Sequence, residues 1–201
     1  YITSKLSRID DQTARAAAII DHMRMFGRKS SGKAELLNPC DILKSSLDLV
    51  GEQLRLSQVE VIQMYPQSCG GCGVVEGHGI QLEQVILNLL TNSRDAMSDN
   101  VKDKWIRLSI KADPVKVEIS IEDNGSGIPA SIIGRVFEPF YTTKEVGKGT
   151  GLGLSISYGI IQDMGGRLEV SNGSNGAIFT ITLPVKKYAD NCPRVKKEGK
   201  K

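Results

Sequence analysis

The chain has 201 residues, of which 40% are hydrophobic and 24% charged, a composition that allows one or two compact domains and argues against wholesale disorder. Lysine and arginine number 26 against 23 aspartates and glutamates, but residues 186–201 alone hold seven of the basic and two of the acidic residues. The first 185 residues therefore carry 19 basic and 21 acidic side chains, a balance that does not favour nucleic acid as a partner. No apolar run approaches the roughly 18 residues that a membrane-spanning helix needs, so we expect no membrane contact by this chain.

The four cysteines, Cys40, Cys69, Cys72 and Cys192, are too few and too unevenly spaced for a disulfide framework. Reduced thiols and a cytoplasmic location are therefore predicted, which also suits the cytoplasmic part of a membrane-anchored parent protein. Cys69 and Cys72, followed by His78, could form a metal or redox site, but a zinc site needs four ligands and no second pair is present. A glycine-rich turn is the simpler interpretation.

An N-terminal helix is predicted within residues 1–30. Its apolar and small residues recur at alternating spacings of four and three, the heptad pattern of a helix that packs on other helices: Ile2, Leu6, Ile9, Thr13, Ala16, Ile20 and Met23. Thr13 and Ala16 make the middle of this heptad face less apolar, so the helix needs partner helices to be stable. Because the sequence begins at Tyr1, without an initiator methionine, and enters this helix at once, we expect it to be a piece of a longer protein.

From residue 34 to residue 185 strands and helices alternate, which predicts a second domain with a mixed α/β layer. The expected helices span residues 42–54, 81–98 and 152–164, and the expected strands span residues 59–64, 106–110, 115–121, 167–170 and 178–183. The segment 66–79 is predicted to be a glycine-rich turn. Residues 186–201 have no periodicity and are predicted to be a solvated basic tail or linker.

A short glycine-containing segment, Asp123 to Pro129, follows one of the predicted strands. An aspartate at a strand end can accept a hydrogen bond from an exocyclic amine, and Gly125 and Gly127 leave room for a flat base. The alternative is that the segment is simply a turn.

A second glycine run, Gly147 to Leu154, leads directly into a predicted helix. Unpaired backbone N–H groups and the positive end of the helix dipole can face an anion there, and a triphosphate is the natural candidate. The spacing is neither that of a P-loop nor that of a dinucleotide fingerprint. A flexible linker is the alternative, but a linker would not continue into a helix as apolar as the one that starts with Leu152 and Leu154.

Two asparagines, Asn88 and Asn92, lie one turn apart on the polar face of the helix predicted over residues 81–98. Their side-chain oxygens could ligate a hard cation such as magnesium (Mg²⁺) that bridges phosphates, without setting carboxylates against an anionic nucleotide. A solvated helix face, or asparagines satisfied by the core, is the alternative.

Four segments, taken in this order, resemble the motifs of one protein family. Residues 82–97 resemble the N box of sensor histidine kinases, residues 123–129 their first glycine box, residues 136–144 their phenylalanine box and residues 147–154 their second glycine box. The resemblance covers most of residues 80–157 and extends to the final hairpin. It implies an ATP-binding domain of the Bergerat (GHKL) type, a two-layer α/β sandwich of a mixed sheet and helices, in an ATP-dependent protein histidine kinase of a two-component system.

The resemblance also implies roles for individual residues. Asn88 and Asn92 would handle Mg²⁺ and phosphates, Asp123 would recognise the adenine amine, and Phe137 and Phe140 would anchor a lid over about residues 141–150. The full set predicted to bind nucleotide is Asn88, Asn92, Asp95, Asp123, Gly125, Gly127, Ile128, Thr143, Lys144, Lys148, Gly149, Thr150, Gly151, Leu152 and Gly153.

In the same family, residues 1–30 resemble the second helix of a dimerisation hairpin, which implies a homodimer of the full-length protein. The phospho-accepting histidine belongs to the first helix of that hairpin, which this sequence lacks. His22 is followed by Met23 where the motif has an acidic residue, and His78 lies in a turn, so no acceptor is predicted within the chain. The chain should bind ATP but phosphorylate itself poorly, and its protein partner should be the receiver domain of a response regulator.

Two alternatives remain. One is a GHKL ATPase related to DNA gyrase, but those enzymes use a glutamate as the water-activating base where Asn88 stands here. The other is a regulatory dimerisation module with a vestigial nucleotide pocket, against which the intact motifs argue.

Overall fold

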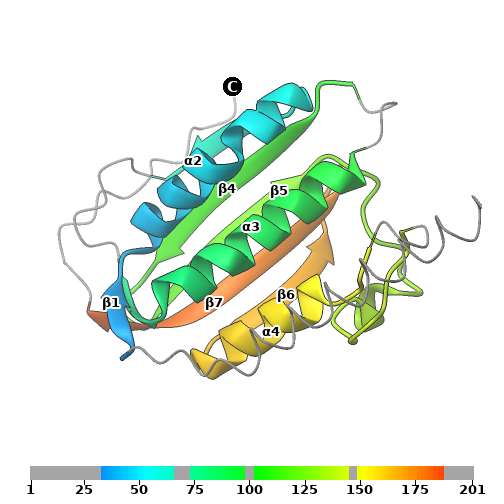
Figure 1. The fold of residues 1–201 in the computed structure, drawn as a ribbon. Helices are drawn as coiled ribbons and strands as arrows, with labels where there is room; N and C mark the ends of the chain where they lie inside the picture. Colours follow the sequence, from blue (N-terminus) through cyan, green and yellow to red (C-terminus); the bar gives the residue numbers. More distant parts are fainter. Residues whose placement is uncertain (1–32, 66–72, 98–101, 145–148, 188–201) are drawn as a thin grey trace, which may run out of the picture.

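The computed structural model describes residues 33–65, 73–97, 102–144 and 149–187, which form a sheet covered on one face by helices (Figure 1). The strands are β1 (Glu35–Leu37), β2 (Glu60–Met64), β3 (Val74–Gly77), β4 (Trp105–Ala112), β5 (Lys116–Asp123), β6 (Arg167–Asn172) and β7 (Ala177–Lys187). The helices are α2 (Pro39–Leu56), α3 (Gly79–Ala96) and α4 (Gly153–Asp163), with a short 3₁₀ turn, η1, at Ile133–Arg135.

The sheet is mixed, with strand order β1-β3-β7-β5-β4-β2. The β2–β4 pair is parallel, and the other pairs are antiparallel. Strand β7 is long enough to pair with β5 on one side and with both β6 and β3 on the other. Figure 1 shows α2, α3 and α4 side by side across a single face of this sheet, so the described part of the chain has two layers.

Local sequence explains where the first two helices form. Helix α2 begins after Asn38, whose side-chain oxygen accepts a hydrogen bond from the Cys40 N–H at 3.1 Å, and Pro39 occupies the first turn. In α3 the apolar residues recur every three or four positions and form one buried face: Leu82, Val85, Ile86, Leu89 and Leu90. This face packs on the sheet and leaves the asparagines on another side of the helix.

The core lies between the helices and the inner face of β4, β5 and β7. Apolar side chains alternate along these strands and are buried: Ile106, Leu108, Ile110, Val117, Ile119, Ile121, Phe179, Ile181 and Leu183. The opposite face carries polar cross-strand pairs, such as Arg107 and Glu122 at 2.7 Å. None of the helices in the described ranges has an apolar stretch long enough to cross a bilayer.

The helices and strands predicted within the described residues are all present, and their ends differ from the expected ones by up to four residues. Two short strands are missing from the sequence prediction: β1 and β3, of which β3 lies within the segment 66–79 that was expected to be a turn. Strand β7 was expected to end at residue 183, and the domain at residue 185, but the strand continues to Lys187. Val185, which follows Pro184, still donates a backbone hydrogen bond to the Val115 carbonyl at 2.9 Å. The predicted helix within residues 1–30 and the tail beyond Lys187 lie outside the described residues.

The prediction of reduced thiols is wrong for Cys40. This residue lies in the first turn of α2, is buried, and is disulfide-bonded. The prediction used spacing along the sequence, whereas a disulfide requires only that two cysteines meet in space. Cys69, Cys72 and Cys192 lie outside the described residues.

Candidate functional site

A buried carboxylate, Asp123, ends β5 at the edge of the helix-covered face. The residue is 1% exposed, and its Oδ1 atom accepts hydrogen bonds from the backbone N–H groups of Gly125 at 2.9 Å and Ala177 at 3.2 Å. Neither the Oδ2 atom nor the nearby Ser93 hydroxyl has a hydrogen-bond partner among the described residues. Because buried polar atoms are almost always paired, an unpaired one calls for an explanation, and the Oδ2 atom is free to accept a hydrogen bond from a ligand.

Burial raises the pKa of the Asp123 carboxyl, and the hydrogen bonds from Gly125 and Ala177 oppose this only in part. Between the usual value of 3.8 and the raised pKa, the folded state binds more protons than the unfolded state. The contribution of Asp123 to stability is therefore greatest at low pH and is lost as the pH rises through the raised pKa.

This shift gives a test that needs no ligand. We expect the melting temperature of wild type, measured relative to Asp123→Asn, to fall as the pH rises from about 4 to 7.5, because only wild type must ionise a buried group. Thermal unfolding of both proteins in matched buffers measures the difference. Parallel profiles over this range would mean that Asp123 titrates as an ordinary surface carboxylate.

Three glycines allow close backbone packing beside Asp123. A Cβ atom on Gly125 would lie 2.8 Å from the Ala96 carbonyl oxygen at the end of α3, and a Cβ atom on Gly176 would collide with Asp123 itself. Gly127 has a φ of +68°, a conformation that favours glycine. The loop after β5 can therefore approach α3 closely, whereas the room for a flat base that its glycines predicted stays a prediction.

Asn172, at the end of β6, holds this loop in place and was not predicted as a site residue. Its Oδ1 atom accepts from the Ile128 N–H at 2.8 Å, and its Nδ2 atom donates to the Ile128 carbonyl at 2.7 Å. The clamp joins residues 44 positions apart, so no local pattern could reveal it.

We expect Asn172→Ala to weaken binding of an adenine nucleotide about tenfold, because one or two backbone-directed hydrogen bonds that order the loop are lost. Calorimetric titration of the variant tests this. Asn175→Ala, an exposed asparagine in the same hairpin, is the control and should bind like wild type. Equal affinity of Asn172→Ala and wild type would show that the loop does not need the clamp.

The two asparagines of α3 face the start of α4. Asn88 donates from Nδ2 to the Ser157 hydroxyl at 3.0 Å, and the Asn92 Nδ2 lies 3.5 Å from the Asn88 Oδ1. A Cβ atom on Gly153 would meet the Asn88 side-chain amide, so glycine lets α4 approach α3 without displacing that side chain. The N-cap residue, Leu152, provides no side-chain cap, which leaves backbone N–H groups at the helix start for other acceptors.

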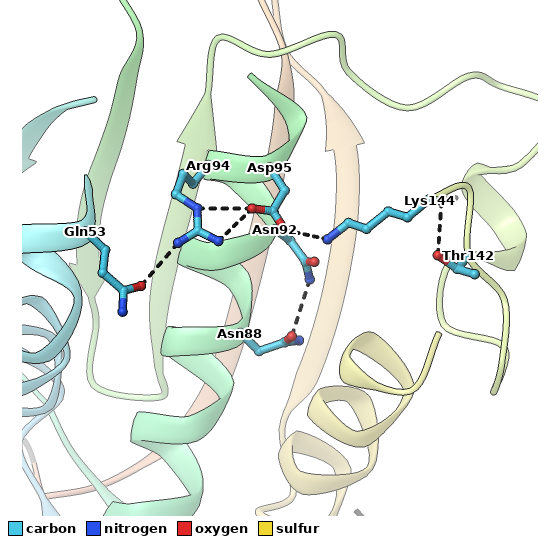
Figure 2. Close-up of polar contacts among 7 residues, drawn as sticks. All are labelled: Gln53, Asn88, Asn92, Arg94, Asp95, Thr142 and Lys144. Atoms are coloured by element: carbon cyan, nitrogen blue, oxygen red, sulfur yellow. Dashed lines mark hydrogen bonds and ion pairs between the residues drawn. The ribbon is translucent and has the colours of Figure 1, made fainter. Parts of the chain in front are cut away.

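Lys144 lies across this site from α3. Its Nζ atom is 2.6 Å from the Asp95 Oδ2, and Arg94 also contacts Asp95, at 2.7 Å (Figure 2). Burial acts to raise the pKa of Asp95, but the hydrogen bonds and charges of Lys144 and Arg94 together outweigh it and hold the pKa below its usual value. Asp95 is therefore an ionised partner of two cations.

Only one of the two expected anchoring phenylalanines is packed. Phe137 is half-buried against the core, and its ring centroid lies 5.3 Å from that of Tyr158 on α4. Phe140 is 59% exposed and has a φ of +66°. The burial expected of an anchor is thus found for Phe137 and not for Phe140.

Several described residues of the predicted set lie on α3 or contact it. Asn88, Asn92 and Asp95 lie on this helix, the Gly125 loop contacts its end, Gly153 contacts Asn88, and Lys144 reaches Asp95. Gly151 has a φ of +66° and packs against the backbone of Phe140, and Thr143 is exposed beside Lys144. Lys148 lies outside the described residues, so the structure does not describe its predicted place.

Residues 77–187 match the family model described as Histidine kinase-, DNA gyrase B-, and HSP90-like ATPase. The chain belongs to this family. The two-component sensor PprA of Pseudomonas aeruginosa is 42% identical over 92% of this chain and 20% of its own length. The sensor kinase CckA of Brucella abortus is 35% identical over 97% of this chain and 22% of its own length, so the chain spans about a fifth of these curated relatives.

Solved structures agree with this assignment. The nucleotide-free catalytic domain of histidine kinase ThkA is 28% identical, with a TM-score of 0.66 over 77% of this chain and 99% of that domain. The Bergerat-type fold and the ATP-binding catalytic domain of a sensor histidine kinase, both predicted from the sequence, are confirmed. ATP is accordingly the ligand that this histidine kinase domain is built to bind.

Proposed function

We propose that this chain binds ATP together with Mg²⁺ and presents the γ-phosphate to a histidine of the same sensor kinase, carried by a helix that the sequence lacks. The observation that carries the proposal is the Asp123 carboxylate, which is buried at a strand end with one oxygen unpaired among the described residues. A buried acceptor of this kind matches the exocyclic amine of adenine.

Asn88 and Asn92 are the residues proposed to hold Mg²⁺. Their amide oxygens are hard ligands, they lie one turn apart, and they add no negative charge beside a triphosphate. When bound, the ion would offset charge on the phosphates during transfer. The chain's own contribution is then to orient the nucleotide between α3 and the start of α4.

Phosphoryl transfer depends mainly on positioning and on charge neutralisation. Thr143, Lys144 and the backbone N–H groups around Gly151 and Gly153 are proposed to close on the phosphates. A neutral imidazole is already a good nucleophile, so the acceptor histidine needs no strong base from this chain.

The remaining partners are proposals at the level of the full-length protein. Residues 1–30 are proposed to be the second helix of a dimerisation hairpin, so the parent protein would be a homodimer. The phosphate would pass on to the receiver domain of a cytoplasmic response regulator. The relatives are named as sensors and sensor kinases, which supports this proposal.

Titration with a nonhydrolysable ATP analogue, with and without Mg²⁺, tests the function. We expect wild type to bind the analogue more tightly with Mg²⁺ than without it. Asn92→Ala should lose most of that gain, which is a loss of affinity of about tenfold, because one oxygen ligand is removed. Gln81→Ala, about three turns away on α3, should keep the full gain. No binding by wild type would overturn the proposed function, and an unchanged gain in Asn92→Ala would overturn the metal role.

A further inference from the structure

We propose that Asp95 is a positioning residue that holds the Lys144 ammonium in the absence of nucleotide and gives it up to the phosphate groups when a nucleotide binds. The proposal rests on the proposed function, since it takes the phosphates to lie over Asn88 and Asn92. We call the group of Lys144, Asp95, Arg94 and Gln53 the lysine latch.

The first half of the latch joins two segments that are distant in the sequence. The Lys144 Nζ atom lies 2.6 Å from the Asp95 Oδ2, across 49 positions. The Lys144 backbone N–H donates to the Thr142 hydroxyl at 3.1 Å, which orients the residue toward α3. Figure 2 shows the Lys144 side chain extending from its loop to the side of α3 that carries Asn88 and Asn92.

The second half holds Asp95 through its other oxygen. Arg94 donates to the Asp95 Oδ1 from Nε at 3.0 Å and from a terminal nitrogen at 2.7 Å. Arg94 in turn donates to the Gln53 Oε1 on α2 at 3.2 Å. The two cations therefore bind separate oxygens of one carboxylate. Asp95 keeps its contacts with Arg94 when Lys144 leaves.

Of the two ion pairs that Asp95 makes, the one with Lys144 is the one that a bound nucleotide can replace. The side chains of Lys144 and Asp95 are 35% and 30% exposed, and ion pairs that exposed are weak. A phosphate chain carries several negative charges and binds an ammonium strongly. Asn92 lies one turn before Asp95 on α3, so phosphates held there compete with Asp95 for the same lysine.

A reactivity measurement tests the latch without any nucleotide. Acetylation of Lys144, followed by peptide mapping, should be several-fold slower in wild type than in Asp95→Asn, because the wild-type nitrogen is held by the carboxylate. The exposed Lys111 should react at the same rate in both proteins and is the internal control. Equal rates at Lys144 would overturn the latch.

A double-mutant cycle tests the competition. At low ionic strength we expect Asp95→Asn to bind a nonhydrolysable ATP analogue about three- to tenfold more tightly than wild type, with a smaller gain for ADP. In a Lys144→Gln background the same change should have little effect, because no lysine remains to be released. Glu83→Gln, which removes a charge elsewhere on α3, controls for the general effect of charge.

The outcomes separate the two proposals. If wild type binds no ATP analogue, the proposed function is wrong, whatever the acetylation shows. If wild type binds but Asp95→Asn gains as much in the Lys144→Gln background as in wild type, the gain is a general charge effect and the latch is wrong. Weaker binding by Asp95→Asn would also overturn it, since the carboxylate would then assist the nucleotide rather than compete with it.

Discussion

Asp123→Asn is expected to weaken ATP binding about 100-fold while leaving the fold intact, because the acceptor proposed to bind the adenine amine becomes an amide and a charge-assisted hydrogen bond is lost. The Oδ1 position can still accept from Gly125 and Ala177, so the loop after β5 keeps its backbone contacts. The buried charge is also removed, and stability at neutral pH should therefore not fall.

Calorimetry with an ATP analogue measures the expected loss of affinity, and a melting curve measures the expected unchanged stability. The matched control is Glu118→Gln, the same chemical change on the same strand but on the open face of the sheet, where Glu118 is paired with Lys116. Its affinity should equal that of wild type. Wild-type affinity in Asp123→Asn would remove the adenine role from this residue.

The second large effect is expected at Gly176, in the turn before β7. A Cβ atom there would collide with the carbonyl and carboxylate oxygens of Asp123. Gly176→Ala should lower stability by about 2 kcal/mol, as overpacking commonly does, and should lower the melting temperature by roughly 4–8 °C. Because Asp123 must move, we also expect ATP binding to weaken at least about tenfold.

Gly134→Ala is the control for that substitution. Gly134 lies in η1, and a Cβ atom there meets nothing within 4 Å. Its melting temperature and affinity should stay close to those of wild type. If the two alanine variants behaved alike, the close packing of Gly176 on Asp123 would not matter for either stability or binding.

Much of the fold could be predicted because the signals are local. The buried face of α3 repeats every three or four residues, and β4 and β5 alternate apolar and polar residues on either side of the turn at Asp113. Strands β1 and β3 could not be predicted in this way. They have three and four residues, and they exist because they pair with each other and with the end of β7.

The residues of the candidate site also fall into two groups, those predicted from local sequence and those that depend on tertiary packing. Asn88 and Asn92 were predicted from their spacing, and Asp123 from its place at a strand end. The Asn172 clamp and the contact of Lys144 with Asp95 join residues 44 and 49 positions apart, so they depend on tertiary packing. Phe140 is exposed and has a positive φ, and its motif reveals neither.

The most direct test of the account is a comparison of two purine triphosphates. ITP differs from ATP in carrying a carbonyl oxygen where adenine has its amine, so it offers an acceptor to the Asp123 carboxylate in place of a donor. We predict that wild type binds ATP about 100-fold more tightly than ITP and that Asp123→Asn loses most of this preference. Equal affinity of wild type for ATP and ITP would contradict the assignment of Asp123 as the residue that reads adenine.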